Sequence, residues 1–119
     1  MTSQGQLFAN LPSTLEDERF DDLLRRGSTR IERILSHGQS SPPDFWYDQG
    51  EGEWVLLVRG AARLELRDPD EVVELRPGDW IDISPHRRHR VAWTDPDQIT
   101  LWLAVFYDGA AETPRQPVP

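Results

Sequence analysis

Two histidines and one glutamate stand out as residues that could do chemistry. His86 and His89 lie in a short stretch, residues 78–94, that has the pattern of a strand, a loop broken by Pro85 and a second strand. Two strands should therefore meet at a loop that carries both imidazoles. Glu53 opens an apolar run further upstream and could add a carboxylate. Imidazole and carboxylate groups together can hold a divalent metal or act as an acid and a base.

The composition excludes several other kinds of site. The 119 residues include no cysteine and no lysine, which rules out a thiolate nucleophile, a thiolate-held metal and a lysine Schiff base. Any metal must therefore take nitrogen and oxygen ligands. Ser84 could pair with a neighbouring histidine as a nucleophile, but the sequence offers no identifiable orienting acid or oxyanion hole. Neither a phosphate-binding glycine loop nor a Gly-x-Ser-x-Gly elbow is present.

The charge and hydropathy patterns limit the partners. The formal net charge is −8, from 21 acidic and 13 basic residues, so the long-range field should repel nucleic acid. The basic cluster at residues 87–90 is local and is interpreted as a solvated turn. No apolar run is long enough for a membrane span, and the N-terminus lacks a basic segment followed by an apolar one. We therefore expect a cytoplasmic protein that binds neither nucleic acid nor membrane.

The elements that must position these residues are mostly strands. From residue 45 onward, short strand patterns alternate with Pro, Gly and Asp turns at a spacing of about ten residues, which predicts an antiparallel sandwich or barrel. Glu53 begins a segment, residues 53–59, that is apolar on both faces like a buried central strand. Residues 30–36 form a strand with charges on both faces, which favours a sheet edge or a polar barrel lumen. The length fits one domain, which we place at residues 13–107.

The two ends of the chain have different patterns. Residues 1–12 form a polar extension. A helix is predicted over residues 13–26 because capping residues begin the segment, acids fill its first turns and Gly27 can cap its end. The acidic residues of this helix, Glu18 among them, are interpreted as a solvated face. Residues 108–119 are rich in proline and are predicted to form a flexible tail.

Two motifs resemble a known family. The pattern of Gly78, Pro85 and His89 resembles the second conserved motif of the cupins. Glu53, followed after six residues by Gly60, matches the end of their first motif. The resemblance implies an all-β fold, an antiparallel jelly-roll barrel, here preceded by one short helix.

The resemblance covers about residues 30–107 and leaves two alignments open at the first motif. Cupins have two histidines before the motif glutamate, and this chain has none there. If four residues separate the second histidine from the glutamate, the two positions fall on Trp46 and Asp48. If three residues separate them, the positions fall on Tyr47 and Gln49.

The two alignments imply different chemistry. Under the first, Asp48, Glu53 and His89 converge inside the barrel and hold a divalent metal ion such as Fe, Mn, Zn or Ni, and His86 could supply a fourth ligand or contact a bound molecule. Under the second, the tyrosine and the glutamine are weak ligands. Glu53 and His89 then form a hydrogen-bonded acid and base, or simply a satisfied buried pair.

The aromatic residues complete the functional hypotheses. Trp46 and Trp93 replace polar positions of the cupin pattern, so we expect them to contact a small ligand. One hypothesis is a metal-binding cupin that holds a small organic molecule and could be an enzyme. A second is a metal-free, non-catalytic binding or sensing module. A third is a purely structural homodimer, since the resemblance implies pairing through a sheet face, for which Phe45, Tyr47 and Trp54 could supply the interface.

Overall fold

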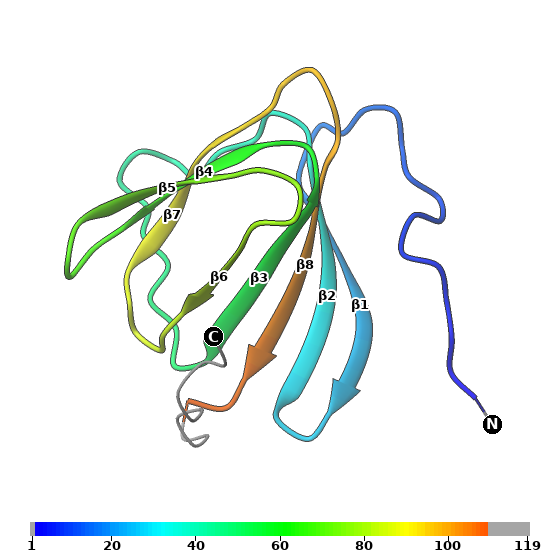
Figure 1. The fold of residues 1–119 in the computed structure, drawn as a ribbon, viewed down its shortest axis with the longest axis horizontal. Coiled ribbons are helices and arrows are strands. Elements are labelled where there is room, and N and C mark those ends of the chain that lie inside the picture. The colour runs from blue at the N-terminus through cyan, green and yellow to red at the C-terminus, as the bar shows by residue number, and fades with distance from the viewer. Residues whose placement is uncertain (1, 110–119) are drawn as a thin grey trace.

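The computed structural model describes residues 2–109, which form two antiparallel sheets (Figure 1). The strands are β1 (Arg19–Arg26), β2 (Thr29–Ser36), β3 (Gly52–Arg59), β4 (Ala62–Leu66), β5 (Glu71–Leu75), β6 (Trp80–Ile83), β7 (His89–Thr94) and β8 (Thr100–Tyr107). The larger sheet has the order β1-β2-β8-β3-β6, and the smaller sheet has the order β5-β4-β7. This arrangement confirms the predicted antiparallel jelly-roll barrel.

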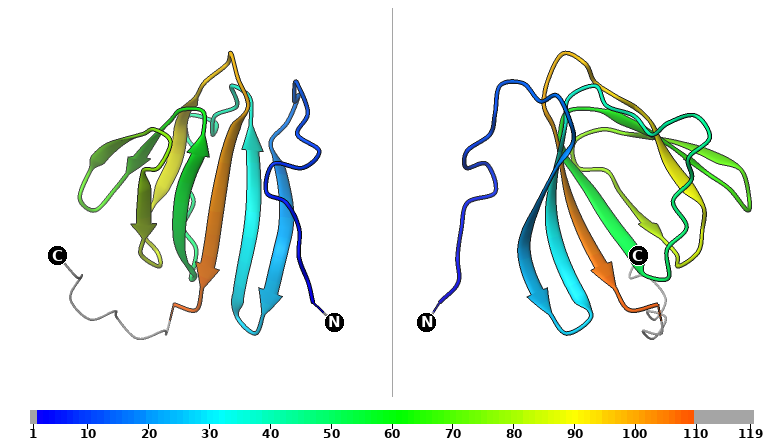
Figure 2. Two further views of the ribbon diagram at one scale, coloured as in Figure 1. Left: turned by 45° about the vertical axis from the view of Figure 1, so that its right-hand side comes forward. Right: turned by 180° about the vertical axis from the view of Figure 1, so that it is seen from behind.

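The two sheets face each other and enclose the core, as the turned views in Figure 2 show. Side chains alternate between the two faces of a strand, so Val55 and Leu57 of β3 point into the core together with Glu53. On the neighbouring strand β8, Ala104 lies opposite Val55 and Phe106 lies opposite Glu53. The predicted strand is thus confirmed and is paired on both edges, with β6 and β8, and it carries Glu53 into the barrel. Only its inward face is buried in the core.

The turn after β3 transfers the chain from the larger sheet to the smaller one. Gly60 has a φ of 95°, a conformation that other residues rarely adopt. A Cβ atom at this position would also collide with Thr100 at the start of β8. The motif glycine is therefore needed for the close approach of this turn to the start of β8.

The predicted helix over residues 13–26 is wrong. Residues 19–26 form β1, which pairs along its length with β2 at the edge of the larger sheet. Gly27 has a positive φ, as a helix cap would, but it turns the β1–β2 hairpin instead. Asp21 of β1 also accepts a hydrogen bond from the buried Arg33 of β2, at 2.7 Å. Pairing with a neighbouring strand thus overrides the local helix signals.

Other elements near the N-terminus and the first motif also differ from the expectation or refine it. The strand predicted at residues 30–36 is confirmed as β2. The strand pattern at residues 45–48 yields only one isolated bridge, between Tyr47 and His89.

Within residues 2–109 there is no helix that could cross a membrane. Most of the predicted flexible tail, residues 110–119, lies outside the described part of the chain.

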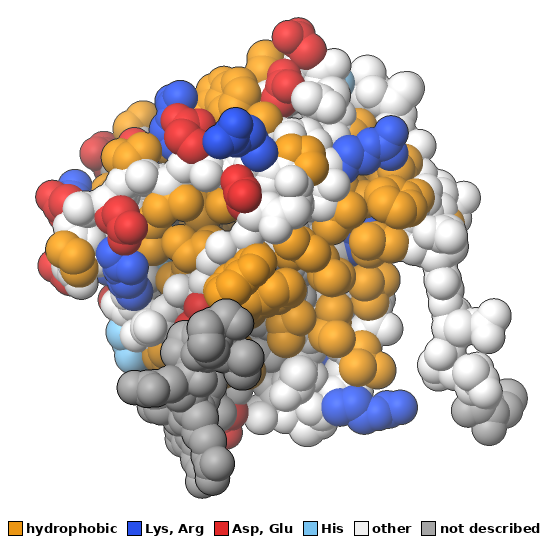
Figure 3. Space-filling view, viewed as in Figure 1, with side chains coloured by type: hydrophobic (Ala, Val, Ile, Leu, Met, Phe, Trp, Pro, Cys, Tyr) orange, Lys and Arg blue, Asp and Glu red, His pale blue; other side chains and the backbone are white. Residues whose placement is uncertain are grey.

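The outward face of the larger sheet is partly apolar. Trp54 and Trp80 point away from the core, since their neighbours Val55 and Ile81 pack into it. The two indole rings lie 5.9 Å apart, and Trp80 is 61% exposed. Figure 3 shows hydrophobic side chains gathered over β3, β8 and β2. We call the surface around Trp54 and Trp80 the tryptophan face.

Candidate functional site

A cavity of about 210 Å³ lies between the two sheets. Most of its wall is apolar and comes from the inward-facing side chains Phe20, Ile34, Val55, Leu64, Ile83, Val91, Trp102 and Phe106. The remainder is polar and ionisable and consists of Glu18, Arg30, Glu32, Tyr47, Gln49, Glu53 and His89. The cavity is therefore amphipathic, which is typical of sites for small organic molecules.

Glu53 and His89 meet in the wall of this cavity. Glu53 lies near the start of β3, His89 begins β7, and the Glu53 Oε1 atom is 3.6 Å from the His89 Nε2 atom. Their side chains are 14% and 6% exposed, so both groups are largely removed from bulk water. The sequence prediction that these two residues share one cavity agrees with this geometry. The distance is slightly longer than a direct hydrogen bond.

The other nitrogen of His89 fixes which form of the ring faces Glu53. The Nδ1 atom lies 2.9 Å from the carbonyl oxygen of Arg87, and because a carbonyl can only accept, Nδ1 carries a proton. In the neutral ring, Nε2 therefore directs a lone pair toward the carboxylate of Glu53. Burial lowers the pKa of His89, but the Glu53 carboxylate and the Arg87 carbonyl together outweigh burial and raise the pKa above its ordinary value of 6.5. The Glu53 carboxylate therefore favours the protonated ring, in which Nε2 also carries a proton.

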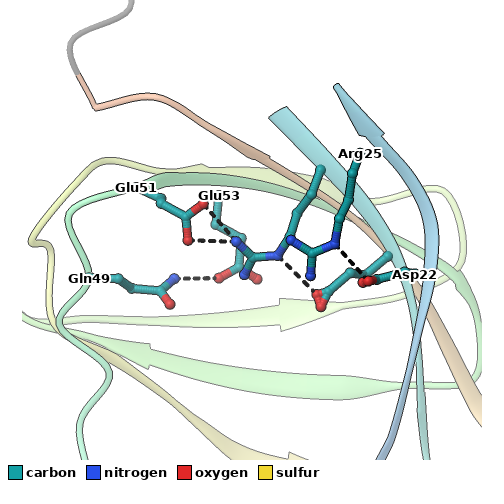
Figure 4. Close-up of polar contacts among 7 residues, drawn as sticks. Asp22, Arg25, Gln49, Glu51 and Glu53 are labelled. Atoms are coloured by element: carbon teal, nitrogen blue, oxygen red, sulfur yellow. Dashed lines mark hydrogen bonds and ion pairs between the residues drawn. The ribbon is translucent and has the colours of Figure 1, made fainter. Parts of the chain in front are cut away.

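Tyr47 and Gln49 flank this pair. Two backbone hydrogen bonds join Tyr47 to His89, and their rings stack with centroids 5.4 Å apart. Gln49 donates from its amide nitrogen to Glu53 Oε1 at 3.1 Å (Figure 4). Burial first, and then the negative charges of Glu18 and Glu53, raise the pKa of Tyr47, so its hydroxyl stays neutral. Both side chains line the cavity, as the second alignment of the first motif implied.

Arg30 forms the charged edge of the cavity. Its Nη1 atom donates to both carboxylate oxygens of Glu51, at 2.8 and 2.7 Å, and its Nε atom donates to Glu32 at 3.3 Å. Figure 4 shows Glu51 and Glu53 near each other on the same side of the barrel. The guanidinium carbon also lies 3.9 Å from the centre of the Phe106 ring. Arg30 is therefore already engaged by two carboxylates and an aromatic ring, and not by Glu53.

Glu18 is a cavity residue that the sequence patterns placed elsewhere. It was interpreted as part of a solvated helix face, but it lies in the loop before β1 and lines the cavity. Its Oε2 atom accepts a hydrogen bond from the hydroxyl of Ser36 at 3.0 Å. Burial raises the pKa of Glu18, and the hydrogen bond from Ser36 lowers it by less. Glu18 could have been placed in the barrel from the sequence only if residues 19–26 had been assigned as a strand.

Asp48 and His86 do not join Glu53 and His89. The side chains of Asp48 and His86 are 52% and 72% exposed, and they contact each other at 2.8 Å through Asp48 Oδ1 and His86 Nδ1. Neither residue lines the cavity. The predicted convergence of Asp48 with the other two residues is therefore wrong. Because alternate side chains point in opposite directions, the bridge at Tyr47 turns Asp48 outward.

The donor set around Glu53 and His89 is small for a metal ion. Within residues 2–109, no three His, Asp or Glu side chains are grouped so that they could hold one. The neighbours Tyr47 and Gln49 offer only a neutral phenol and an amide that already donates to Glu53. Divalent metals in proteins are usually held by three or four imidazole, carboxylate or thiolate ligands. The residues present do not fit such a centre.

The two tryptophans predicted to contact a ligand lie outside the cavity wall. The ring of Trp46 lies under the guanidinium of Arg67, at 4.6 Å, and that of Trp93 lies near Arg63, at 5.8 Å. Trp102 lines the cavity instead. Its position on the inward face of a buried strand is the signal that could have identified it.

Comparisons with known proteins agree with the fold and with the motifs. The family model described as "Cupin domain" matches residues 32–106. Among solved structures, a protein from Ralstonia eutropha JMP134 named "putative mannose-6-phosphate isomerase" is 48% identical, with a TM-score of 0.86 over 90% of this chain and 99% of that chain. None of the curated proteins has a sequence that matches this chain significantly.

Two more distant structures share the fold alone. A cupin superfamily protein from Desulfitobacterium hafniense DCB-2 has a TM-score of 0.70 and 14% identity, over 91% of this chain and 94% of that chain. The polyketide cyclase RemF from Streptomyces resistomycificus has a TM-score of 0.70 and 17% identity, over 90% of this chain and 80% of that chain.

Proposed function

The chain belongs to the cupin family, and we propose that it binds a small organic molecule in the cavity between its two sheets, with the polar group of that molecule at Glu53 and His89. The observation that carries this proposal is the placement of His89 Nε2 opposite Glu53 Oε1, 3.6 Å away, in a wall that is otherwise mostly apolar. A ligand hydroxyl or carbonyl can interact with this pair, while the rest of the ligand contacts hydrophobic side chains.

The size and lining of the cavity define the class of ligand. A volume of about 210 Å³ is smaller than the range of about 300–1,000 Å³ that is common for drug-sized molecules. The ligand is therefore a compact molecule, such as a single ring with one or two oxygen atoms. Trp102 and Phe106 provide aromatic surface for the ring, and the protonated form of His89 provides an Nε2 donor for an oxygen atom.

We further propose that ligand binding does not depend on a divalent metal. Among the described residues, no three His, Asp or Glu side chains are grouped so that they could hold a metal ion, and Asp48 points away from Glu53 and His89. The rival hypothesis is that Fe, Mn, Zn or Ni binds to these two residues and supplies a Lewis acid. Elemental analysis of the untagged protein distinguishes them, because the rival requires near-stoichiometric metal that is lost in His89→Ala.

A phosphorylated sugar is a poor match for this cavity, although one relative is named for an isomerase of such a sugar. Three carboxylates, Glu18, Glu32 and Glu53, line the cavity, and Arg30 is already paired with acidic residues. A phosphate dianion would be repelled, and an apolar wall cannot satisfy several sugar hydroxyls. We propose that the ligand of this chain is neutral and mostly apolar.

Cyclohexanone and mannose 6-phosphate are suitable probes for this proposal. With protein treated with EDTA, we expect cyclohexanone at millimolar concentration to shift the indole N–H resonance of Trp102 in NMR spectra and to leave that of Trp93 in place. Mannose 6-phosphate should shift neither. A shift of the Trp102 resonance by mannose 6-phosphate but not by cyclohexanone would contradict the proposed ligand class.

We also propose that two copies of the chain pair through the tryptophan face. Trp80 is highly exposed and packs against Trp54, and large exposed aromatic groups are typical of protein interfaces. Tyr47, by contrast, stacks on His89 in the cavity, and therefore is not available for the expected interface. Analytical ultracentrifugation should find a dimer that dissociates in Trp80→Asp, and a monomeric native protein would contradict the pairing.

A further inference from the structure

The cavity contains a second ionisable centre that faces the same space as Glu53 and His89. Glu18, in the loop before β1, lines the cavity together with Trp102 and the Glu53–His89 pair. The cavity is only about 210 Å³ in volume, so a ring-sized ligand that fills it must contact more than one of its walls. Tyr47 is close enough to both centres to be affected by each, because, in addition to burial, the negative charges of Glu18 and Glu53 both raise the pKa of its hydroxyl.

A directed chain of hydrogen bonds positions the carboxyl group of Glu18. The indole nitrogen of Trp102 can only donate, and it donates to the hydroxyl oxygen of Ser36 at 3.1 Å. The Ser36 hydroxyl in turn donates to Glu18 Oε2 at 3.0 Å. Ser36 is fully buried and Trp102 is 4% exposed, so the bond between these two residues is shielded from water. The Ser36 hydroxyl uses Glu18 Oε2 as its acceptor. Among the described residues no hydrogen bond is made to Glu18 Oε1, so the lone pairs of this atom can interact with a ligand.

We propose that Glu18 is a catalytic base of this cavity, which removes a proton from the carbon next to a ligand carbonyl while His89, supported by Glu53, gives a proton to the carbonyl oxygen. This inference rests on the proposed ligand site and adds a reaction to it. The substrate class is a small ketone or aldehyde with a hydrogen atom on the adjacent carbon, and the reaction class is enolisation, the first half of a proton-shift isomerisation.

The proposed step balances in atoms and charge. The carbon–hydrogen bond breaks, its proton forms an O–H bond with Glu18 Oε1, and its electron pair forms the carbon–carbon double bond of the enol. The π pair of the carbonyl moves to oxygen, which takes the proton from His89 Nε2. Glu18 ends as a neutral acid and His89 as a neutral imidazole. In the reverse step Glu18 gives a proton to carbon and the enol O–H proton passes back to His89 Nε2, which restores both groups. If Glu18 first exchanges its proton with solvent, the result is hydrogen exchange, and if the proton goes to a different carbon, the result is isomerisation, in both cases without any redox partner.

The electrostatic surroundings suit these roles. The charged and titratable groups that share the cavity with Glu18 and His89 are Arg30, Glu32, Tyr47 and Glu53. Burial raises the pKa of Glu18, which makes its carboxylate a stronger base, and Glu53 raises the pKa of His89, which favours the imidazolium form. The rate should therefore increase as Glu18 ionises and decrease as His89 loses its proton, which gives a bell-shaped pH profile.

Deuterium exchange into cyclohexanone, followed by proton NMR in D₂O, tests the proposal. We expect the native protein to accelerate the exchange of the hydrogens next to the carbonyl. Glu18→Gln should reduce that acceleration by about 10²- to 10⁴-fold, the range for a general base, and cyclohexanone should still shift the Trp102 resonance in this variant. Glu16→Gln, which alters an exposed carboxylate two residues away, is the matched control and should exchange like the native protein.

The outcomes separate this inference from the proposed binding function. If cyclohexanone binds but exchanges no faster than it does free in solution, or equally fast with Glu18→Gln, the catalytic role of Glu18 is wrong and the binding site remains. If cyclohexanone does not shift the Trp102 resonance, the binding proposal itself fails. Should Glu18→Gln not fold, Ser36→Ala provides the second variant, and an unchanged exchange rate and pH profile in that folded variant would overturn the proposal.

Discussion

Two histidine–carboxylate pairs lie close together in the sequence but in opposite environments. His86 and Asp48 contact each other at 2.8 Å on the surface, with side chains that are 72% and 52% exposed. His89 and Glu53 are separated by 3.6 Å in the cavity wall, with side chains that are 6% and 14% exposed. The shorter contact is therefore the one in water, and the longer contact is the one in the cavity.

The comparison teaches that surroundings, rather than contact distance, identify the candidate site. Water and salt screen the exposed pair, so its interaction adds little. The buried pair has Gln49 and Tyr47 as neighbours, an apolar wall around it and a raised pKa at His89. Electrostatic interactions of Glu53 and His89 with a shared proton or with a bound ligand are strong, because few water molecules screen these buried groups.

The largest expected effect is a gain in metal affinity when two histidines are introduced next to the buried pair. In the double variant Tyr47→His and Gln49→His, two imidazoles would join Glu53 and His89 in the cavity wall, and we expect affinity for Zn²⁺ to increase by at least about 100-fold. Isothermal titration calorimetry measures this change. The matched control, Trp46→His with Asp48→His, places the new imidazoles on the outward face, and a larger gain there would contradict the observed side-chain directions.

A smaller effect is expected when each histidine is replaced. We expect His89→Gln to weaken cyclohexanone binding by about 10- to 100-fold, because a hydrogen bond from a charged donor contributes about 1.5–3 kcal/mol. His86→Gln should leave binding within about twofold, since His86 lies outside the cavity. NMR titration gives both dissociation constants. Equal losses in the two variants would mean that the cavity is not the binding site.

The smallest expected effect concerns stability as a function of pH. Because the pKa of His89 is raised in the folded state, its contribution to stability is fully present below its ordinary value of 6.5 and is lost as pH rises through the raised folded value. Urea unfolding at pH 5.5 and pH 8.5 should therefore show a stability difference that is reduced in His89→Gln by an amount on the order of 1 kcal/mol. His86→Gln is the control. An unchanged difference in His89→Gln would contradict the coupling to Glu53.

The fold was predictable because its signals are repeated along the chain. Strand patterns, Pro-Gly and Asp-Pro turns and the two motif glycines all indicate one antiparallel barrel, and tertiary pairing only reinforces them. The segment at residues 13–26 was different, because its capping residues satisfy a helix as well as they satisfy a hairpin. Only the pairing of β1 with β2 decides between the two, and that pairing is not a local property of the sequence.

The site was predictable in part. Glu53 and His89 belong to recognisable motifs, and their convergence was foreseen from those motifs. The choice between Asp48 and Gln49 depended on a one-residue register, which the single bridge between Tyr47 and His89 settles. The position of Glu18 in the cavity could not be foreseen, since it depends on the pairing of β1, which directly follows Glu18, with β2 at the edge of the larger sheet. The cytoplasmic location and the homodimer remain predictions.

The imidazole resonances of the three histidines provide the most direct test of the central claim, that the Glu53–His89 pair in the cavity is the ligand site. In ¹H–¹⁵N NMR spectra of metal-free protein, added cyclohexanone should shift the signals of His89 and leave those of His37 and His86 unchanged. Glu53→Gln should reduce the shift at His89. A ligand-dependent shift at His86 with none at His89 would contradict the account.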